Sequence, residues 1–238
     1  MTVPDLPPVI VSPFVSAGFE LIPAAFHRGN IDALLVELES LADAPGHRNL
    51  MKSFPAVAKI AASEKIQELL HHRTGQTFFP VRSIFFDKTP EANWLVPWHQ
   101  DLTIAVQERV EREGYGPWSL KNGTVHVQPP LAILQGMAAV RIHLDDADET
   151  NGALRVLPGS HLLGRLDAAA IVAERARVKE IACPARAGDI LLMRPLLLHA
   201  SSPALRPAHR RVIHLEYASC ALAEGLEWAE TLPATIRK

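Results

Sequence analysis

Residues Gly188–Pro203 read GDILLMRPLLLHASSP, and this stretch indicates the fold class more directly than any other. Gly188 and Asp189 form a turn signal, and the apolar run that follows predicts a buried strand. His199 ends the run, so its imidazole is expected at the rim of a buried sheet. A hydrogen-bonded core histidine is the ordinary explanation for a lone histidine in such a place, and a metal ligand is the alternative.

Short β-rich runs separated by Pro, Gly, Asp and Asn lie on both sides of this stretch. The predicted strands are Phe78–Phe86, Leu102–Val106, Met137–Leu144, Leu154–Leu157, Val178–Ala182, Ile190–Met193 and Val212–Ala218. One predicted helix, Leu166–Arg177, interrupts them, and the Gly- and Pro-rich connection Glu108–Pro130 is expected to be a loop or lid. Many short strands without regular helix alternation predict a mainly β sandwich or barrel with helices packed outside.

Helical patterns are concentrated before Thr77. Asn30 is the expected N-cap of a helix with apolar residues from Ile31 to Leu41, stopped by Pro45-Gly46, and a second helical region covers about 55–73, with Gly75 after its end. We expect a single domain over residues 1–238. Within it, residues 1–76 form a helical N-terminal preface, residues 77–219 form the catalytic core and residues 220–238 form a C-terminal extension.

The composition is that of an ordinary soluble globular protein. The 24 Lys and Arg are balanced by 26 Asp and Glu, for a net charge of −2, and no long run of one sign suggests nucleic acid or an anionic membrane as a partner. Cys183 and Cys220 are isolated from each other, which suits a reducing cytoplasm. No apolar window approaches the roughly 18 residues of a membrane span, and no signal peptide is evident. A basic cluster suited to a coenzyme A 3′-phosphate is not evident either.

The segment PWHQDL, residues 97–102, places His99 and Asp101 two residues apart. On a strand these two side chains project to one face and Gln100 to the other. The pair alone is weak evidence for a metal site, but with His199 it completes two histidines and one carboxylate, the ligand set of non-haem Fe(II) oxygenases. Eleven residues after His199, Arg210 opens a strand, and its guanidinium suits the distal carboxylate of a small dicarboxylate. The neighbouring Arg211 is expected to face the other way.

Four segments in this order and spacing resemble the phytanoyl-CoA dioxygenase family of Fe(II)- and 2-oxoglutarate-dependent oxygenases. They are NWLVPWHQDL, HLDDADETNGALRVLPGSH, AGDILLMRPLLLHASSP and HRRVIHLEY, and the resemblance covers about residues 81–217. It implies a double-stranded β-helix, the cupin-like jelly roll, with Fe(II) held by His99, Asp101 and His199. The block NGALRVLPGSH is specific to the family, but as a turn, strand and turn it is assigned to architecture.

The resemblance also implies roles for residues around the metal. Arg210 and Ser201 would bind the C5 carboxylate of 2-oxoglutarate. Arg141 occupies a strand position where relatives often have tryptophan, so it is expected to contact 2-oxoglutarate or a substrate anion, and Arg82 is a further inward-facing candidate on its strand. The candidates for lining a substrate pocket are Trp98, Trp118, His126 and Gln128.

The function expected from these features is an Fe(II)- and 2-oxoglutarate-dependent dioxygenase. With O2 it would oxidise, most simply hydroxylate, a small organic molecule and release succinate and CO2. Two alternatives remain open at this point. One is a jelly-roll metal-binding protein without oxidative activity, and the other is a cupin-type metal-dependent hydrolase or isomerase, in which the metal activates water.

Overall fold

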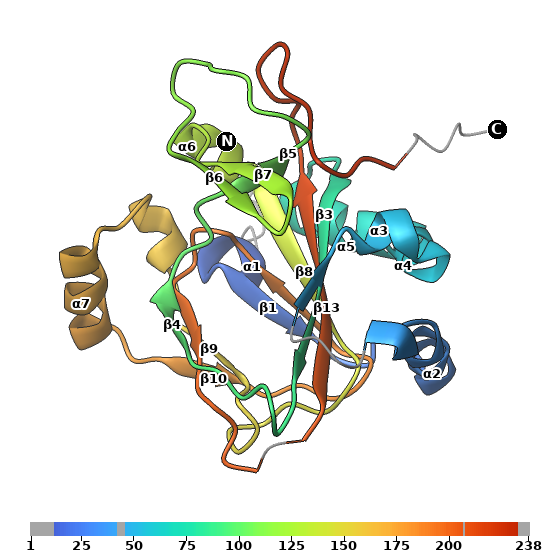
Figure 1. The fold of residues 1–238 in the computed structure, drawn as a ribbon. Coiled ribbons are helices and arrows are strands. Elements are labelled where there is room, and N and C mark those ends of the chain that lie inside the picture. The colour runs from blue at the N-terminus through green and yellow to red at the C-terminus, as the bar shows by residue number, and fades with distance from the viewer. Residues whose placement is uncertain (1–11, 42–45, 207, 233–238) are drawn as a thin grey trace, which may run out of the picture.

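The computed structural model describes residues 12–41, 46–206 and 208–232, and antiparallel sheets form its centre (Figure 1). The larger sheet has six strands in the order β1-β11-β8-β13-β3-β2. Their bounds are β1 Phe19–Ile22, β11 Ile190–Met193, β8 Met137–His143, β13 Arg210–Ala218, β3 Phe79–Lys88 and β2 Gly46–Arg48. The long strand β13 pairs with β8 on one side and with β3 on the other.

A four-stranded sheet in the order β10-β9-β12-β4 lies opposite the larger sheet. Its strands are β10 Ile181–Cys183, β9 Leu154–Val156, β12 His199–Ser201 and β4 Val96–His99. One apolar cluster joins the facing sides of the two sheets, with Ala139, Leu191 and Met193 from the larger sheet and Leu154, Val156 and Cys183 from the smaller. These facing antiparallel sheets confirm the predicted mainly β, double-stranded β-helix core.

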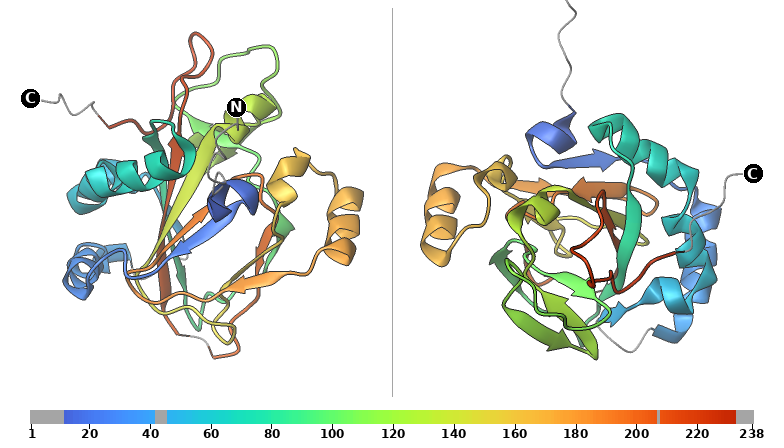
Figure 2. Two further views of the ribbon diagram at one scale, coloured as in Figure 1. Left: turned by 180° about the vertical axis from the view of Figure 1, so that it is seen from behind. Right: turned by 90° about the horizontal axis from the view of Figure 1, so that it is seen from above.

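The helices of the N-terminal part cover the outer face of the larger sheet (Figure 2). In chain order the helices are α1 Pro13–Ser16, α2 Arg28–Glu37, η1 Glu39–Leu41, α3 Leu50–Ser53, α4 Pro55–Ala61, α5 Glu64–Thr74, α6 Leu131–Gln135, η2 Ser160–Leu163 and α7 Ala168–Arg177. Ile31, Leu34, Val57, Ile66 and Leu70 of these helices pack with the outward residues of β8, β11 and β13 in one cluster. Strand alternation leaves the opposite set of residues on these strands facing the barrel interior.

The N-terminal part differs from the predicted preface in two respects. Besides helices it supplies β1 and β2, the two edge strands of the larger sheet. Its first predicted helix begins earlier, at Arg28, and the N-cap is His27, not Asn30. The carbonyl of His27 accepts the N–H of Asn30 at 2.9 Å, so the first turn is already formed before Asn30 could cap it. Pro45, part of the predicted stop, lies outside the described residues.

The predicted loop or lid at Glu108–Pro130 was wrong in its conformation. It contains β6 Trp118–Lys121 and β7 Thr124–Val127, which form a hairpin and, with β5 Ile104–Val106, a third sheet in the order β5-β7-β6. Asn122 and Gly123 both have positive φ at the hairpin turn, the combination favoured in two-residue β-hairpins. The C-terminal extension then pairs with this sheet through the bridge Val106↔Trp228.

Candidate metal centre and cosubstrate pocket

His99 and His199 meet across two neighbouring strands of the smaller sheet. The strands β4 and β12 pair with these two residues in register, so both imidazoles project from the same face. Their ring centroids are 4.2 Å apart. One histidine was expected from each segment, and the antiparallel register brings the two segments together although they lie far apart in the sequence.

Asp101 supplies the carboxylate from the link that follows β4. His99 and Asp101 do not lie on one continuous strand, because β4 ends at His99 and the next strand, β5, begins at Ile104. The N–H of Asp101 instead bonds the carbonyl of Pro195 at 2.8 Å. Asp101 Oδ1 lies 3.7 Å from His99 Nε2, and its Oδ2 lies 3.7 Å from His199 Nε2.

Gln100, between the two ligands, points elsewhere, as predicted. Its Nε2 donates to the carbonyls of Gly164 and Leu196 at 2.8 and 2.7 Å, and its Oε1 accepts the N–H of Leu166 at 2.8 Å. These bonds fasten the link to two other segments and hold Asp101 on the side of the histidines.

The protonation of the two imidazoles fits a metal site. His99 Nδ1 lies 2.8 Å from the carbonyl of Pro97, and His199 Nδ1 lies 2.9 Å from the carbonyl of Leu197. Each Nδ1–H therefore donates to a backbone acceptor, and each Nε2 keeps its lone pair for a metal. Burial lowers the pKa of His199 to about 4, which keeps its ring neutral. In the described residues His99, Asp101 and His199 form a group whose ligand atoms all lie within 4.8 Å of one another.

A second cluster of buried polar side chains lies where strand β13 begins. Arg210 is 4% exposed, and its Nη1 donates to the carbonyl of Gly152 and lies 3.4 Å from Ser201 Oγ. Lys88 stands opposite Arg210 on β3 and is 1% exposed. Its Nζ donates to Ser201 Oγ at 2.9 Å and to the carbonyl of Ser202 at 2.7 Å. Among the described residues neither cation has a carboxylate partner, so this cluster carries unpaired positive charge, which suits an anion.

A family model decides the identification. The model described as phytanoyl-CoA dioxygenase (PhyH) matches residues 14–212. The chain belongs to the phytanoyl-CoA dioxygenase family. None of the curated proteins compared with the chain matches it at the level of sequence.

Solved structures of related enzymes share the fold. The carbocyclase SnoK from nogalamycin biosynthesis is 16% identical at a TM-score of 0.70, and the match covers 91% of this chain and 85% of that one. HygX from Streptomyces hygroscopicus, with nickel and 2-oxoglutarate bound, is 17% identical at a TM-score of 0.65, and the match covers 93% of this chain and 90% of that one. The epimerase SnoN in complex with Fe3+, alpha ketoglutarate and nogalamycin RO is 16% identical at a TM-score of 0.71, and the match covers 96% of this chain and 91% of that one.

Family membership and the triad together make the chain a 2-oxoglutarate-dependent non-haem iron enzyme. Its cofactor is Fe(II), and its cosubstrates are 2-oxoglutarate and O2.

No helix in the described part of the chain is long and apolar enough to cross a membrane.

A chain of polar side chains follows the inner face of the larger sheet, between the triad and the cluster around Arg210. Arg141 Nη1 lies 3.1 Å from His214 Nδ1, and because an arginine only donates, this nitrogen is the acceptor. His214 Nε2 then carries the hydrogen and faces Glu216 Oε1 at 3.5 Å. The same oxygen accepts from Arg82 Nη1 at 2.8 Å. The sequence suggested Arg141 and Arg82, but His214 and Glu216 emerge only from the strand register.

This chain of side chains influences Asp101, the candidate carboxylate ligand of the triad. Burial alone raises the pKa of Asp101, but His199, His214, His99 and Arg82 outweigh it, and the pKa of the carboxyl is lowered. The side chain of Asp101 is therefore held as a carboxylate, the form that a metal would require. Arg211, next to the inward-facing Arg210, lies outside this interior, as predicted, and forms two bonds of 2.8 Å with Asp145.

The candidate substrate residues lie in different surroundings. Trp98 is half-buried with Arg155 and Arg175 each 5.6 Å from its ring centre, and strand alternation turns it away from the metal side of β4. Trp118 packs into the apolar cluster of the third sheet. His126 is fully buried on the other face of that sheet, and the backbone of Gln128 bonds Gly116 and Pro117.

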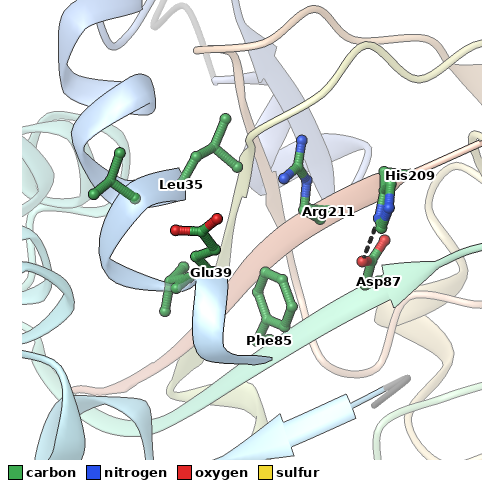
Figure 3. A pocket seen from close by; sticks show the side chains of 8 residues that line it. Leu35, Glu39, Phe85, Asp87, His209 and Arg211 are labelled. Atoms are coloured by element: carbon green, nitrogen blue, oxygen red, sulfur yellow. Dashed lines mark hydrogen bonds and ion pairs between the residues drawn. The ribbon is translucent and has the colours of Figure 1, made fainter. Parts of the chain in front are cut away.

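A separate hollow of about 310 Å³ lies on the outer face of the larger sheet, away from the triad (Figure 3). Leu35 and Glu39 form one side of it, and Phe85, Asp87 and His209 form the other. His209 Nδ1 bonds Asp87 at 2.7 Å. None of the triad residues lines this hollow.

Proposed function

We propose that this enzyme hydroxylates a small organic molecule. The observation that supports this most strongly is the placement of the triad and of the buried cations Arg210 and Lys88 inside one barrel. A dicarboxylate such as 2-oxoglutarate would bind the metal with one end and the buried cations with its other carboxylate. When bound, Fe(II), 2-oxoglutarate and O2 supply the oxidation, in which 2-oxoglutarate gives succinate and CO2 and one oxygen atom is transferred to the substrate.

The residues of this chain bind and orient the reactants. His99, Asp101 and His199 would hold the metal on one side and leave its remaining positions open. Arg210, Lys88 and Ser201 would bind the C5 carboxylate of 2-oxoglutarate. Arg141 is fully inside the barrel beside His214, where it would contact the cosubstrate or an anionic part of the substrate. Since Asp101 is present as a ligand, a halide has no vacated position, which favours hydroxylation over halogenation.

Two features bear on where the enzyme acts and on the hydrolase alternative. Cys183 and Cys220 are free thiols, which supports a reducing cytoplasm. The sequence has no long run of basic residues, which fits a small-molecule substrate.

A zinc or manganese hydrolase would give the buried cations Arg210 and Lys88 no role. In the oxygenase both cations would bind the C5 carboxylate of 2-oxoglutarate.

An anaerobic titration tests the proposal. Adding Fe(II) and 2-oxoglutarate to the protein should produce the weak visible charge-transfer band of such complexes. His99→Ala should lose the band, whereas His72→Ala, an exposed histidine on α5, should keep it. No band in the wild type, or an equal band in His99→Ala, contradicts the proposal, and a screen for succinate release over candidate metabolites then identifies the substrate.

A further inference from the structure

The β6–β7 hairpin brings a lysine to the metal end of the barrel. Lys121 ends β6, and its Nζ lies 3.5 Å from Thr103 Oγ1. Thr103 follows the metal ligand Asp101 by two residues. Lys121 is exposed, so a ligand arriving from solvent can reach it.

Two arginines from the larger sheet lie near this lysine. Arg48 on β2 stands opposite Ile84, and strand alternation places Arg82, two residues before Ile84, on the same inward face. The next residue along, Asn49, has its Nδ2 3.4 Å from Thr124 Oγ1, and Thr124 is paired with Lys121 across the hairpin. The segment that carries Arg48 therefore touches the hairpin that carries Lys121.

The positive charges at this end exceed the negative ones. Among the described residues, Glu216 is the carboxylate that is paired with one of these cations, and it is bonded to Arg82 and faces His214. Within the described residues neither Arg48 nor Lys121 forms an ion pair, and Arg48 Nε is buried without a hydrogen-bond partner. Burial, Arg82 and Arg48 all lower the pKa of Lys121, which shows that the cations repel one another.

This cluster is separate from the pocket for 2-oxoglutarate. Arg82 is opposite Glu216, and Lys88, six residues further along β3, is opposite Arg210. Six residues of strand correspond to about 20 Å, which is far longer than one 2-oxoglutarate molecule. A cosubstrate bound to Arg210 and the metal therefore does not reach Arg48, Arg82 or Lys121, and of these three cations only Arg82 is paired with a carboxylate among the described residues.

We propose that Arg48, Arg82 and Lys121 bind an anionic oxygen group of the primary substrate, a carboxylate or a phosphate. The inference rests on the proposed oxygenase function and specifies its substrate class. Placing an anion between these cations relieves their repulsion and holds the substrate over the open side of the triad. A neutral substrate gains neither effect. The sequence shows no such cluster because its members come from β2, β3 and β6.

Binding of simple anions tests this proposal without turnover. The protein is loaded with Ni(II) and 2-oxoglutarate, and phenyl phosphate, benzoate and the neutral benzyl alcohol are titrated separately by calorimetry. We expect at least one anion to bind at least about tenfold more tightly than benzyl alcohol, with an affinity that falls as salt is added. The stronger of the two anions distinguishes a phosphate from a carboxylate substrate.

Charge-matched variants separate this site from general surface charge. Arg48→Gln and Lys121→Gln should each weaken anion binding about three- to tenfold and reduce its salt dependence. Arg28→Gln and Lys59→Gln make the same charge change on exposed residues of α2 and α4 and should not weaken it. Equal binding of benzyl alcohol, no anion binding, or equal losses in the control variants would overturn the proposal. Absence of the Fe(II)–2-oxoglutarate band would instead contradict the oxygenase function itself.

Discussion

His99 and His199 stand directly opposite each other on β4 and β12, and each donates its Nδ1–H to the carbonyl of the residue two positions before it. Both Nε2 atoms are thereby turned toward Asp101 before any metal arrives. Such preorganisation lowers the cost of binding, because neither ring has to change its tautomer or its orientation.

Metal binding should stabilise the fold through this triad. At a concentration 100 times its dissociation constant, Fe(II) or Ni(II) should add about 2.7 kcal/mol to the free energy of unfolding. His199→Ala should lose this increment, while the exposed His71→Ala should retain it. The measurement is chemical denaturation with and without metal, kept anaerobic for iron. An equal metal-dependent increment in His199→Ala would mean that the metal binds elsewhere.

Lys88→Met should stabilise the protein without ligands and weaken 2-oxoglutarate binding. Lys88 is buried and has no carboxylate partner in the described part of the chain, so removing its charge should raise the free energy of unfolding by about 1–2 kcal/mol at pH 7. The same change removes a cation from the cosubstrate pocket, and the affinity for 2-oxoglutarate should fall at least about tenfold. Denaturation and calorimetry measure the two effects. A less stable variant with unchanged affinity would make Lys88 a structural residue.

From the pKa of Lys88 we predict opposite pH dependences for the stability of the protein and for its affinity for 2-oxoglutarate. Burial and the charges of Arg210 and Arg141 lower its pKa from 10.5 to about 8. Between these values the unfolded chain binds more protons than the folded one, so stability should rise with pH from about 8 to 10.5. Affinity for 2-oxoglutarate should fall over the same interval, because the ammonium group is lost. In Lys88→Met both slopes should be smaller than in the wild type.

Arg82 and Glu216 should behave as a coupled buried pair. Their side chains are 11% and 7% exposed, so removing one leaves the other buried without its partner. Arg82→Leu and Glu216→Leu should each cost about 3 kcal/mol of stability, and the double variant should cost less than the sum by about 1–3 kcal/mol. Urea denaturation of the four proteins in this cycle measures the coupling. Strictly additive losses would contradict it.

The sequence predicted that His99, Asp101 and His199 would come together, and the structure shows this grouping. His99, Asp101, His199 and Arg210 sit in short segments whose order and separation are specific, and strand alternation correctly separates Arg210 from Arg211. The hairpin of β6 and β7 also had a local signal, since Asn122-Gly123 lies between two short β-rich runs. That signal was outweighed by the Gly and Pro content around it.

The remaining site residues depend on contacts between distant segments. Lys88, His214 and Glu216 become neighbours of Arg210, Arg141 and Arg82 only through the pairing of β13 with β3 and β8. Glu230 is a further case, because it is 1% exposed and accepts from the Ser83 N–H and hydroxyl, 147 residues earlier. Local periodicity contains no information on such pairings, since register is fixed by the assembled core.

Trp98→Leu should affect stability and leave the two binding sites intact. The guanidinium carbons of Arg155 and Arg175 are each 5.6 Å from the centre of the Trp98 ring, on the side of β4 that faces away from His99. Losing the stacked guanidinium groups should cost about 1 kcal/mol of stability. The Fe(II)–2-oxoglutarate band should keep its intensity, and anion binding at Arg48 and Lys121 should not change. A loss of substrate turnover at unchanged stability would support the substrate role predicted for Trp98 from the sequence.

His126 should make the fold sensitive to acid. It is fully buried, and burial, with the nearby Arg82, lowers its pKa from 6.5 to about 4. Its Nδ1 lies 3.0 Å from the carbonyl of Thr124, which fixes the neutral ring on the hairpin. Between pH 6.5 and 4 the unfolded chain therefore binds a proton that the folded chain does not, and stability should fall as the pH falls through this window. The loss attributable to this histidine is on the order of 1–3 kcal/mol.

His126→Gln removes the titrating group and keeps a polar side chain of similar reach. The variant should therefore show a flatter decline in stability from pH 6.5 to 4 than the wild type, measured by urea denaturation at each pH in the absence of metal. His72→Gln is the matched control and should follow the wild-type curve, because its ring is exposed. Parallel curves for all three proteins would show that His126 is protonated without cost, and the buried environment on the hairpin would then contribute nothing to the acid sensitivity of the enzyme.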